Sequence, residues 1–144
     1  MTDKQAIQEM LERYKSAAFE KDVDAFVALF DENVRVFDMW GRWSYDGAGE
    51  WHAMVSEWFG SLGDERVAVE FEDVQTVTGD GVAAAHAFVT FTGLSADGAE
   101  LRSMNNRLTW VLRKAADGAW KVVHEHTSAP IDFETAKVRL SRRG

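Results

Sequence analysis

The sequence predicts an α+β domain, with helices in its first third and long antiparallel strands after them. From Ile7 to Ala18 the apolar residues recur at spacings of three and four, which is typical of a helix with one buried face. After Gly63 apolar and polar residues alternate over long segments, which indicates strands. Tight-turn signals containing Asp-Gly separate these strands at residues 79–81, 96–98 and 116–118. This order places the helices on one face of an antiparallel sheet.

The first third contains three expected helices and two short strands. Thr2 begins a capping-box pattern ahead of the first helix, and Asp22 can cap a second, shorter one. Residues 33–39 alternate as a strand, and residues 42–46 can return as a short hairpin strand. Residues 47–61 carry apolar side chains at helical spacing and predict the third helix.

Longer strands are expected after the third helix, at residues 67–78, 82–94, 100–113 and 119–128. The residues from 132 onward are expected to form a short helix or a frayed tail. A length of 144 residues suits one domain, and the chain shows no linker, repeat or low-complexity segment. We therefore expect residues 1–144 to form a single domain.

The composition argues against several classes of function. The net charge of −8 argues against nucleic acid as a partner, because binding of phosphates requires a basic surface. No apolar run approaches the roughly 20 residues of a membrane span, and the N-terminus lacks the profile of a signal peptide. The absence of cysteine removes disulfides and cysteine-based zinc sites. We expect a cytoplasmic protein that binds neither nucleic acid nor membranes.

Two of the four histidines lie on the last expected strand. Alternation along a strand puts Trp120, His124 and His126 on one face. Two imidazoles at this spacing could bind a metal, with His52, His86 or a carboxylate as a third ligand. One of them could instead serve catalysis or ligand binding. The favoured interpretation is structural, with hydrogen-bonded histidines that hold the strand in place, and we expect neither a metal nor a cofactor.

The order of elements resembles that of the nuclear-transport-factor-2-like superfamily. The last strand is similar to the W-x-x-V-H-x-H-x-S-x-P ending of SnoaL-like domains, through Trp120, Val123, His124, His126, Ser128 and Pro130. The association (hub) domain of calcium/calmodulin-dependent kinase II has a similar ending. The resemblance implies a cone-shaped, curved antiparallel sheet with three N-terminal helices, a small organic ligand and a homodimer formed through the sheet. It does not select a function, because the superfamily includes isomerases, cyclases, dehydratases and non-catalytic binding modules.

The first third is also similar, without gaps, to the start of ketosteroid isomerases over residues 13–14, 22–25 and 31–38. In that family a tyrosine on the first helix donates a hydrogen bond to the dienolate oxygen, and an aspartate on the first strand moves the proton. The resemblance places Tyr14 and Asp38 in these roles. The second, protonated acid of that family corresponds to a position near Asn106, whose amide can also donate a hydrogen bond.

The two resemblances disagree about which side chains of the last strands point inward. The isomerase register points Asn106, Leu108, Trp110, His124 and His126 inward. The hub register points Val89, Thr109 and Thr127 inward. We favour the isomerase register because Tyr14 and Asp38 align without a gap, although a β-bulge would reverse it locally.

We therefore expect a small, mostly apolar organic molecule to bind between the helices and the sheet. The candidate ligand-binding residues are Trp40, Trp51, Trp58, Trp110, Trp120 and His124. As an enzyme, the protein would carry out cofactor-free proton transfer in an isomerisation, cyclisation or dehydration. Asp38 would be the base, and Tyr14, Asn106 or His126 would be hydrogen-bond donors. The alternative is a non-catalytic module for ligand binding or oligomerisation.

Overall fold

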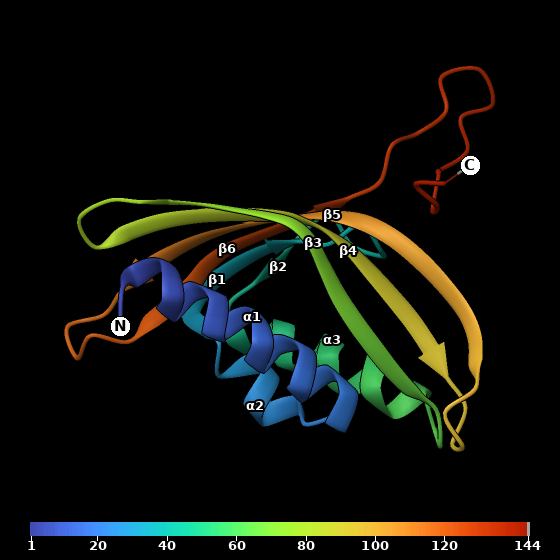
Figure 1. Cartoon of the computed structure of the whole chain (residues 1–144), viewed down its shortest axis with the longest axis horizontal. Coiled ribbons are helices and arrows are strands. Elements are labelled where there is room, and N and C mark those ends of the chain that lie inside the picture. Colours follow the sequence, from blue (N-terminus) through green and yellow to red (C-terminus); the bar gives the residue numbers. More distant parts are fainter. Residues whose placement is uncertain (144) are drawn as a thin grey trace.

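In the computed structural model, which describes residues 1–143, three helices lie against the concave face of a curved six-stranded sheet (Figure 1). The helices are α1 (Asp3–Glu20), α2 (Val23–Val27) and α3 (Ala48–Ser61). The strands are β1 (Phe30–Phe37), β2 (Tyr45–Asp46), β3 (Arg66–Thr78), β4 (Val82–Leu94), β5 (Glu100–Lys114) and β6 (Trp120–Ser128). The predicted α+β class is confirmed.

The strands follow the spatial order β2-β1-β6-β5-β4-β3. The meander from β3 to β6 is antiparallel, as the three tight turns predict. The pairing of β1 with β6 is parallel, which the sequence analysis did not anticipate. This pair connects the N-terminal third of the chain with the last strand. It places the end of β1 beside the end of β6. Residues that follow β1 can therefore share a site with the last residues of β6.

Side-chain caps define the connection between α1 and α2. Thr2 Oγ1 accepts a hydrogen bond from Gln5 N at 3.1 Å, and Gln5 Oε1 accepts one from Thr2 N at 2.8 Å, so the predicted capping box is present. Lys21 ends α1 in the left-handed region with φ 55°, and the Asp22 side chain accepts from Ala25 N at 3.0 Å to start α2. These caps fix the position of α1 on the sheet, where it packs against β3.

A β-bulge divides β6 into two parts with opposite facing. Val122 pairs with Leu112 and His124 pairs with Val111, so Val123 is the extra residue. Before the bulge, Trp120 and Val122 are buried against the helices. After it, the inward positions fall to Glu125 and Thr127 and no longer to the histidines. The prediction that His124 and His126 point inward is therefore wrong, for the physical reason that one inserted residue exchanges the two faces of a strand.

The remaining inward positions combine both registers expected from the sequence. On β5, Asn106, Leu108 and Trp110 are buried, as the isomerase register predicts. Thr109 is exposed, so its predicted inward position in the hub register is wrong. Thr127 is buried, in agreement with the hub register. A further irregularity in β3, between Glu72 and Gln75, adds to the bend of the sheet, and Asp73 takes φ 54° there.

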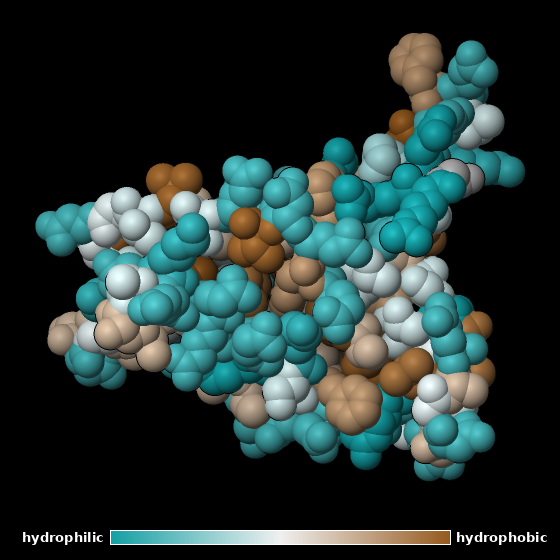
Figure 2. Space-filling model, viewed as in Figure 1, coloured by the Kyte–Doolittle hydropathy of each residue, from teal (hydrophilic) through white to brown (hydrophobic). Residues whose placement is uncertain are grey.

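The segment after β6 contains no helix within residues 129–143, so of the two alternatives expected there the short helix is not formed. It leaves the body of the molecule as an extended loop, in which Ile131 bridges Val138, and then returns to the sheet (Figure 1). Asn105 N donates to Leu140 O at 2.7 Å, which ties the returning segment to β5. The surface over the helices is largely hydrophilic in the same view (Figure 2). None of the helices in residues 1–143 combines the length and the apolar character needed to cross a bilayer.

Candidate functional site

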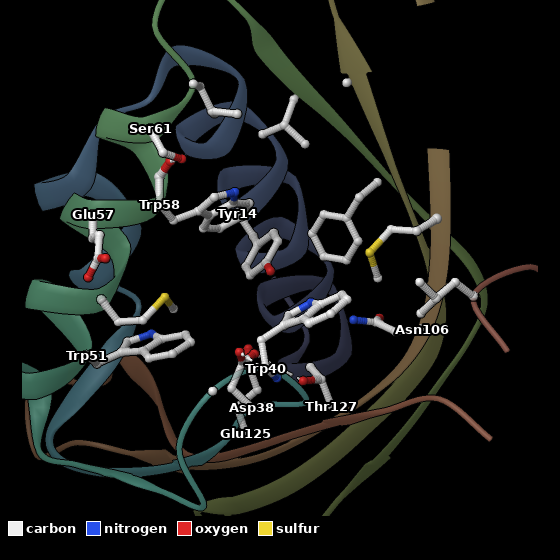
Figure 3. A pocket seen from close by; sticks show the side chains of 18 of the residues that line it. Tyr14, Asp38, Trp40, Trp51, Glu57, Trp58, Ser61, Asn106, Glu125 and Thr127 are labelled. Atoms are coloured by element: carbon white, nitrogen blue, oxygen red, sulfur yellow. Dashed lines mark hydrogen bonds between the residues drawn. The ribbon is translucent and has the colours of Figure 1, made fainter. Parts of the chain in front are cut away.

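A cavity of about 790 Å³ lies between α1, α3, the inner face of the sheet and the loop that joins β1 to β2 (Figure 3). Its volume falls within the range of small-molecule binding sites. Its walls include Trp51 and Trp58 on α3, Phe91 on β4 and the half-exposed Trp40 in the β1–β2 loop. Most of the lining is apolar, with a few polar side chains that come from separate elements.

Asp38 follows β1 directly and points into the cavity (Figure 3). Its carboxylate accepts hydrogen bonds from Thr127 Oγ1 and from Trp40 N, each at 3.2 Å. Burial raises the pKa of Asp38 above its usual value, although these hydrogen bonds act in the opposite direction. The parallel pairing of β1 and β6 explains the contact, because it brings Thr127 beside the end of β1.

Glu125 is the most buried polar residue of the site, with 1% of its surface exposed. Its Oε1 accepts a hydrogen bond from Trp110 Nε1 at 2.9 Å, while its Oε2 has no hydrogen-bond partner among residues 1–143. Burial is the main cause that raises the pKa of Glu125 to about 8, and the negative charge of Asp38 adds to it. The hydrogen bond from Trp110 opposes this rise in pKa without cancelling it. A pKa of about 8 favours the protonated, neutral form of Glu125 at pH 7.

Tyr14 brings a hydroxyl to the same cavity from the buried face of α1 (Figure 3). Its ring packs against Phe26 and Trp110, with centroids 4.6 and 6.0 Å away. The hydroxyl has no hydrogen-bond partner in the described part of the chain, so it is not tied to a neighbouring protein group. Burial raises the pKa of Tyr14 well above its usual value, and the carboxyl groups of Glu125 and Asp38 raise it further. Tyr14 thus stays protonated and available as a donor.

The sequence analysis expected Asp38, Tyr14, Asn106, Trp40, Trp51 and Trp58 in one site, and all six line this cavity. Trp110 does not line the cavity, but its indole Nε1 donates a hydrogen bond to Glu125 Oε1. Trp120 lies elsewhere, with Nε1 donating to Asp3 Oδ1 at 3.3 Å near the start of α1. Trp120, which was expected among the ligand-binding residues, does not line this cavity.

His124 and His126 lie on the outer face of the sheet, outside the cavity. His124 Nδ1 donates to Arg35 O at 2.7 Å, which agrees with a structural role in holding β6 to β1. Both rings lie against Phe37, with centroid distances of 4.9 and 5.5 Å. The bulge at Val123 therefore places both histidines outside the cavity, in which they were expected.

Within residues 1–143, no three His, Asp or Glu side chains lie together in a way that could hold a metal ion. His52 lies on α3, with its Nε2 3.0 Å from Oδ1 of Asp24 on α2. His86 is exposed on β4. His52 and His86 are therefore not brought together with His124 and His126 into a metal site.

Sequence reasoning missed Glu125 because plain alternation assigned it to the outer face. The signal that could have identified it is the hub register, which points Thr127 inward and therefore also implies Glu125, two residues earlier. The hub register placed Thr127 inward, but the contact of Thr127 with Asp38 was not anticipated.

Comparison with known proteins places the chain within a family. Solved structures with the same fold include a protein of unknown function from Pseudomonas putida, described as NTF2-like. It is 24% identical over 95% of this chain and 93% of its own, with a TM-score of 0.83. A protein from Xanthomonas campestris, described as a candidate association domain of calcium/calmodulin dependent protein kinase II, is 14% identical over 90% and 89%, with a TM-score of 0.75.

ActVI-ORFA from Streptomyces coelicolor is 14% identical over 86% of this chain and 94% of its own, with a TM-score of 0.76. At these identities the three structures establish the fold alone. None of the curated proteins compared with the sequence matches it. The sequence profile of the SnoaL-like domain matches residues 7–132, which is most of the chain. The chain therefore belongs to the SnoaL-like domain family.

Proposed function

We propose that the cavity binds a small, mostly apolar ketone and that the protein transfers a proton at the carbon next to the carbonyl without a cofactor. The observation that carries the proposal is the set of three polar groups in one apolar cavity: Asp38, Glu125 and Tyr14. Their surroundings give them different proton states. One is a carboxylate, and two are protonated donors, which is the division that acid–base catalysis requires.

Asp38 suits the role of the base. Hydrogen bonds from Thr127 and Trp40 favour its ionised form, while burial raises its pKa and so makes it a stronger base than an exposed aspartate. The carboxylate would take a proton from the carbon next to the carbonyl. The electron pair of that C–H bond then forms the C=C bond of an enolate, and the negative charge passes to the oxygen.

Tyr14 and Glu125 suit the stabilisation of that oxygen. Trp110 occupies Glu125 Oε1, so the acidic proton is carried by Oε2, which has no partner among residues 1–143. The Tyr14 hydroxyl is likewise without a partner there and lines the same cavity. Two donors in a mostly apolar site stabilise a developing oxyanion. Glu125 would thereby supply the second acid that the sequence analysis sought near Asn106, while Asn106 remains an amide at the same cavity.

The second half of the reaction decides its class. If Asp38 returns the proton to a different carbon, the outcome is an isomerisation. If the enolate instead expels a hydroxyl from the neighbouring carbon, with a proton from the protein, the outcome is a dehydration. Both begin with the same proton abstraction, so one experiment tests the shared step.

The test is exchange of the hydrogens next to the carbonyl of 1-tetralone, an apolar bicyclic ketone, in D₂O, followed by NMR. We expect the wild-type protein to accelerate exchange and Asp38→Asn to lose about 100-fold or more of that acceleration. Asp80→Asn, which changes an exposed carboxylate in the β3–β4 turn, is the matched control and should leave exchange unchanged. Equal exchange by wild type and Asp38→Asn would refute the role of Asp38.

The non-catalytic alternative predicts a different result with the same compound. A binding module would show a rise in melting temperature with 1-tetralone, as binding to the folded state stabilises it, but no exchange above the rate in buffer. The partner-free hydroxyl of Tyr14 favours the catalytic proposal, since a donor left unpaired in an apolar site has no structural use.

We also propose that two copies of the chain associate through the outer face of the sheet. The helices cover only the concave face (Figure 1). The outer face carries the aromatic group of Phe37, His124 and His126. Val77 and Val82 are 68% and 51% exposed at the end of the same sheet. Light scattering after size exclusion should give twice the 16.2 kDa of one chain. A monomer at all concentrations would contradict this part of the proposal.

A further inference from the structure

Two buried polar atoms at the cavity walls have no hydrogen-bond partner within residues 1–143, namely Trp51 Nε1 and Asn106 Oδ1. The first is a donor on α3 and the second is an acceptor on β5. Figure 3 places their side chains on opposite sides of the cavity, with Asp38 and Glu125 between them. Native proteins rarely leave buried polar groups unpaired, so each such atom requires an explanation.

Asn106 is poorly satisfied at both ends of its amide. Its Nδ2 donates only to the thioether of Met39, with 3.4 Å between N and S, and sulfur is a weak acceptor. Its neighbour Asn105 shows the contrast on the other face of the same strand. Asn105 Nδ2 donates to Thr90 Oγ1 at 2.8 Å, and its Oδ1 accepts from Arg142 N at 2.9 Å. The strand thus holds one amide used for structure and one left for another purpose.

Both unpaired atoms are shut off from bulk solvent in the free protein. Methionines are the neighbours that can give way. Met39 contacts Asn106, and Met54 lies one turn beyond Trp51 on the same side of α3 and also lines the cavity. Methionine side chains are unbranched and flexible, so a ligand can displace them at low cost.

We infer that the ligand carries polar groups at both ends, an acceptor oxygen that pairs with Trp51 Nε1–H and a hydroxyl that pairs with Asn106 Oδ1. This inference rests on the proposed function for the position of the ketone at Tyr14 and Glu125, and it adds two further points of recognition. The ligand is therefore an oxygenated ring compound with at least a carbonyl, a second acceptor and a hydroxyl. Trp51 and Asn106 determine specificity for it, and a bare ring ketone binds in the same cavity but less tightly.

The test compares the affinity of 1-tetralone with those of its 5-, 6- and 7-hydroxy and methoxy derivatives, measured by calorimetry. A hydroxyl supplies a donor and an acceptor, whereas a methoxy group supplies only an acceptor. We expect the best hydroxy derivative to bind wild type about tenfold more tightly than 1-tetralone. Asn106→Leu should remove the advantage of hydroxyl over methoxy, and Trp51→Phe should remove the advantage of methoxy over the parent compound.

The melting temperature of the free protein gives a second test, because a structural role for Asn106 predicts the opposite change. Leucine at position 106 has nearly the same shape and no orphaned atom, so Asn106→Leu should raise the melting temperature of the free protein by about 2–4 °C. The matched control Asn105→Leu breaks two hydrogen bonds and should lower it, while the ranking of the tetralones stays the same. A lower melting temperature for Asn106→Leu would show that Asn106 is a structural residue, and would overturn the inference.

The result for binding is separable from the result for catalysis. If no tetralone exchanges its hydrogens but the loss of hydroxyl selectivity in Asn106→Leu is observed, the inference stands and the proton-transfer proposal fails. If exchange depends on Asp38 but no hydroxy derivative binds more than about twofold better than 1-tetralone, the inference fails alone. If Trp51→Phe folds poorly, the affinities of the wild-type protein for the methoxy derivatives and for 1-tetralone test whether an acceptor oxygen on the ligand improves binding.

Discussion

Replacing Glu125 by glutamine is expected to stabilise the protein in a way that depends on pH. The pKa of Glu125 rises from 4.5 to about 8 in the folded state. Between these values the folded protein holds a proton that the unfolded chain has lost, so stability falls as the pH rises through this window. At 1.36 kcal/mol per pKa unit the penalty is of order 3 kcal/mol at pH 7 and 5 kcal/mol above pH 8. Below pH 4.5 the penalty vanishes.

Glutamine avoids this penalty because it cannot ionise, and it keeps the oxygen that accepts Trp110 Nε1. Glu125→Gln should therefore raise the melting temperature by roughly 10 °C near pH 8 and by less than about 2 °C at pH 4. Thermal melts by circular dichroism between pH 4 and pH 9 provide the measurement. Glu57→Gln, an exposed carboxylate on α3 beside the same cavity, is the control and should show no such trend.

A Glu125→Gln stabilisation of the same size at pH 4 and pH 8 would refute the reasoning, because it would show that the protonation of Glu125 does not change on folding. A destabilisation at pH 8 would refute it as well. Either result would remove the neutral acid from the proposed mechanism, since the same burial underlies both.

Three further outcomes follow from the site. Tyr14→Phe should slow exchange of 1-tetralone about tenfold or more and leave the melting temperature within a few degrees, because the hydroxyl that it removes has no partner in residues 1–143. Thr127→Val removes a hydrogen bond that lowers the pKa of Asp38, so the acid limb of the pH–rate profile should move to higher pH. In wild type the pH–rate profile should be bell-shaped, with the rate falling again above about pH 8 as Glu125 ionises. Exchange rates measured in quenched samples at a series of pH values would test this.

The helices and the meander were predictable because each rests on local chemistry. Thr2 and Gln5 form the capping box that their spacing indicates, and β4 has the bounds that alternation and its flanking turns predict. Tyr14 and Asp38 line the cavity, as expected, because α1 and β1 in the first third of the chain fix their positions.

The missed features depend on contacts that local patterns do not encode. The bulge at Val123 carries no glycine or proline, and only pairing with Leu112 and Val111 reveals it. The parallel pairing of β1 with β6 joins strands about 90 residues apart, which alternation within one strand cannot show. Glu125 was hidden by the first of these features, and the contact of Thr127 with Asp38 by the second.

The extra residue in β6 has a consequence for how such a cavity can change its chemistry over time. If β6 lost the bulge but kept Val123, plain alternation would return and the pairing with β5 would shift by one residue after Val122. His124 and His126 would then occupy the places of Glu125 and Thr127, so that two imidazoles replace a carboxylic acid and a hydroxyl. Loss of the bulge alone can in this way convert an acidic wall of the cavity into a basic one while the hydrophobic half of the strand stays in place. A strand that carries alternative chemistry on its reverse side gives the fold a short evolutionary route between reactions.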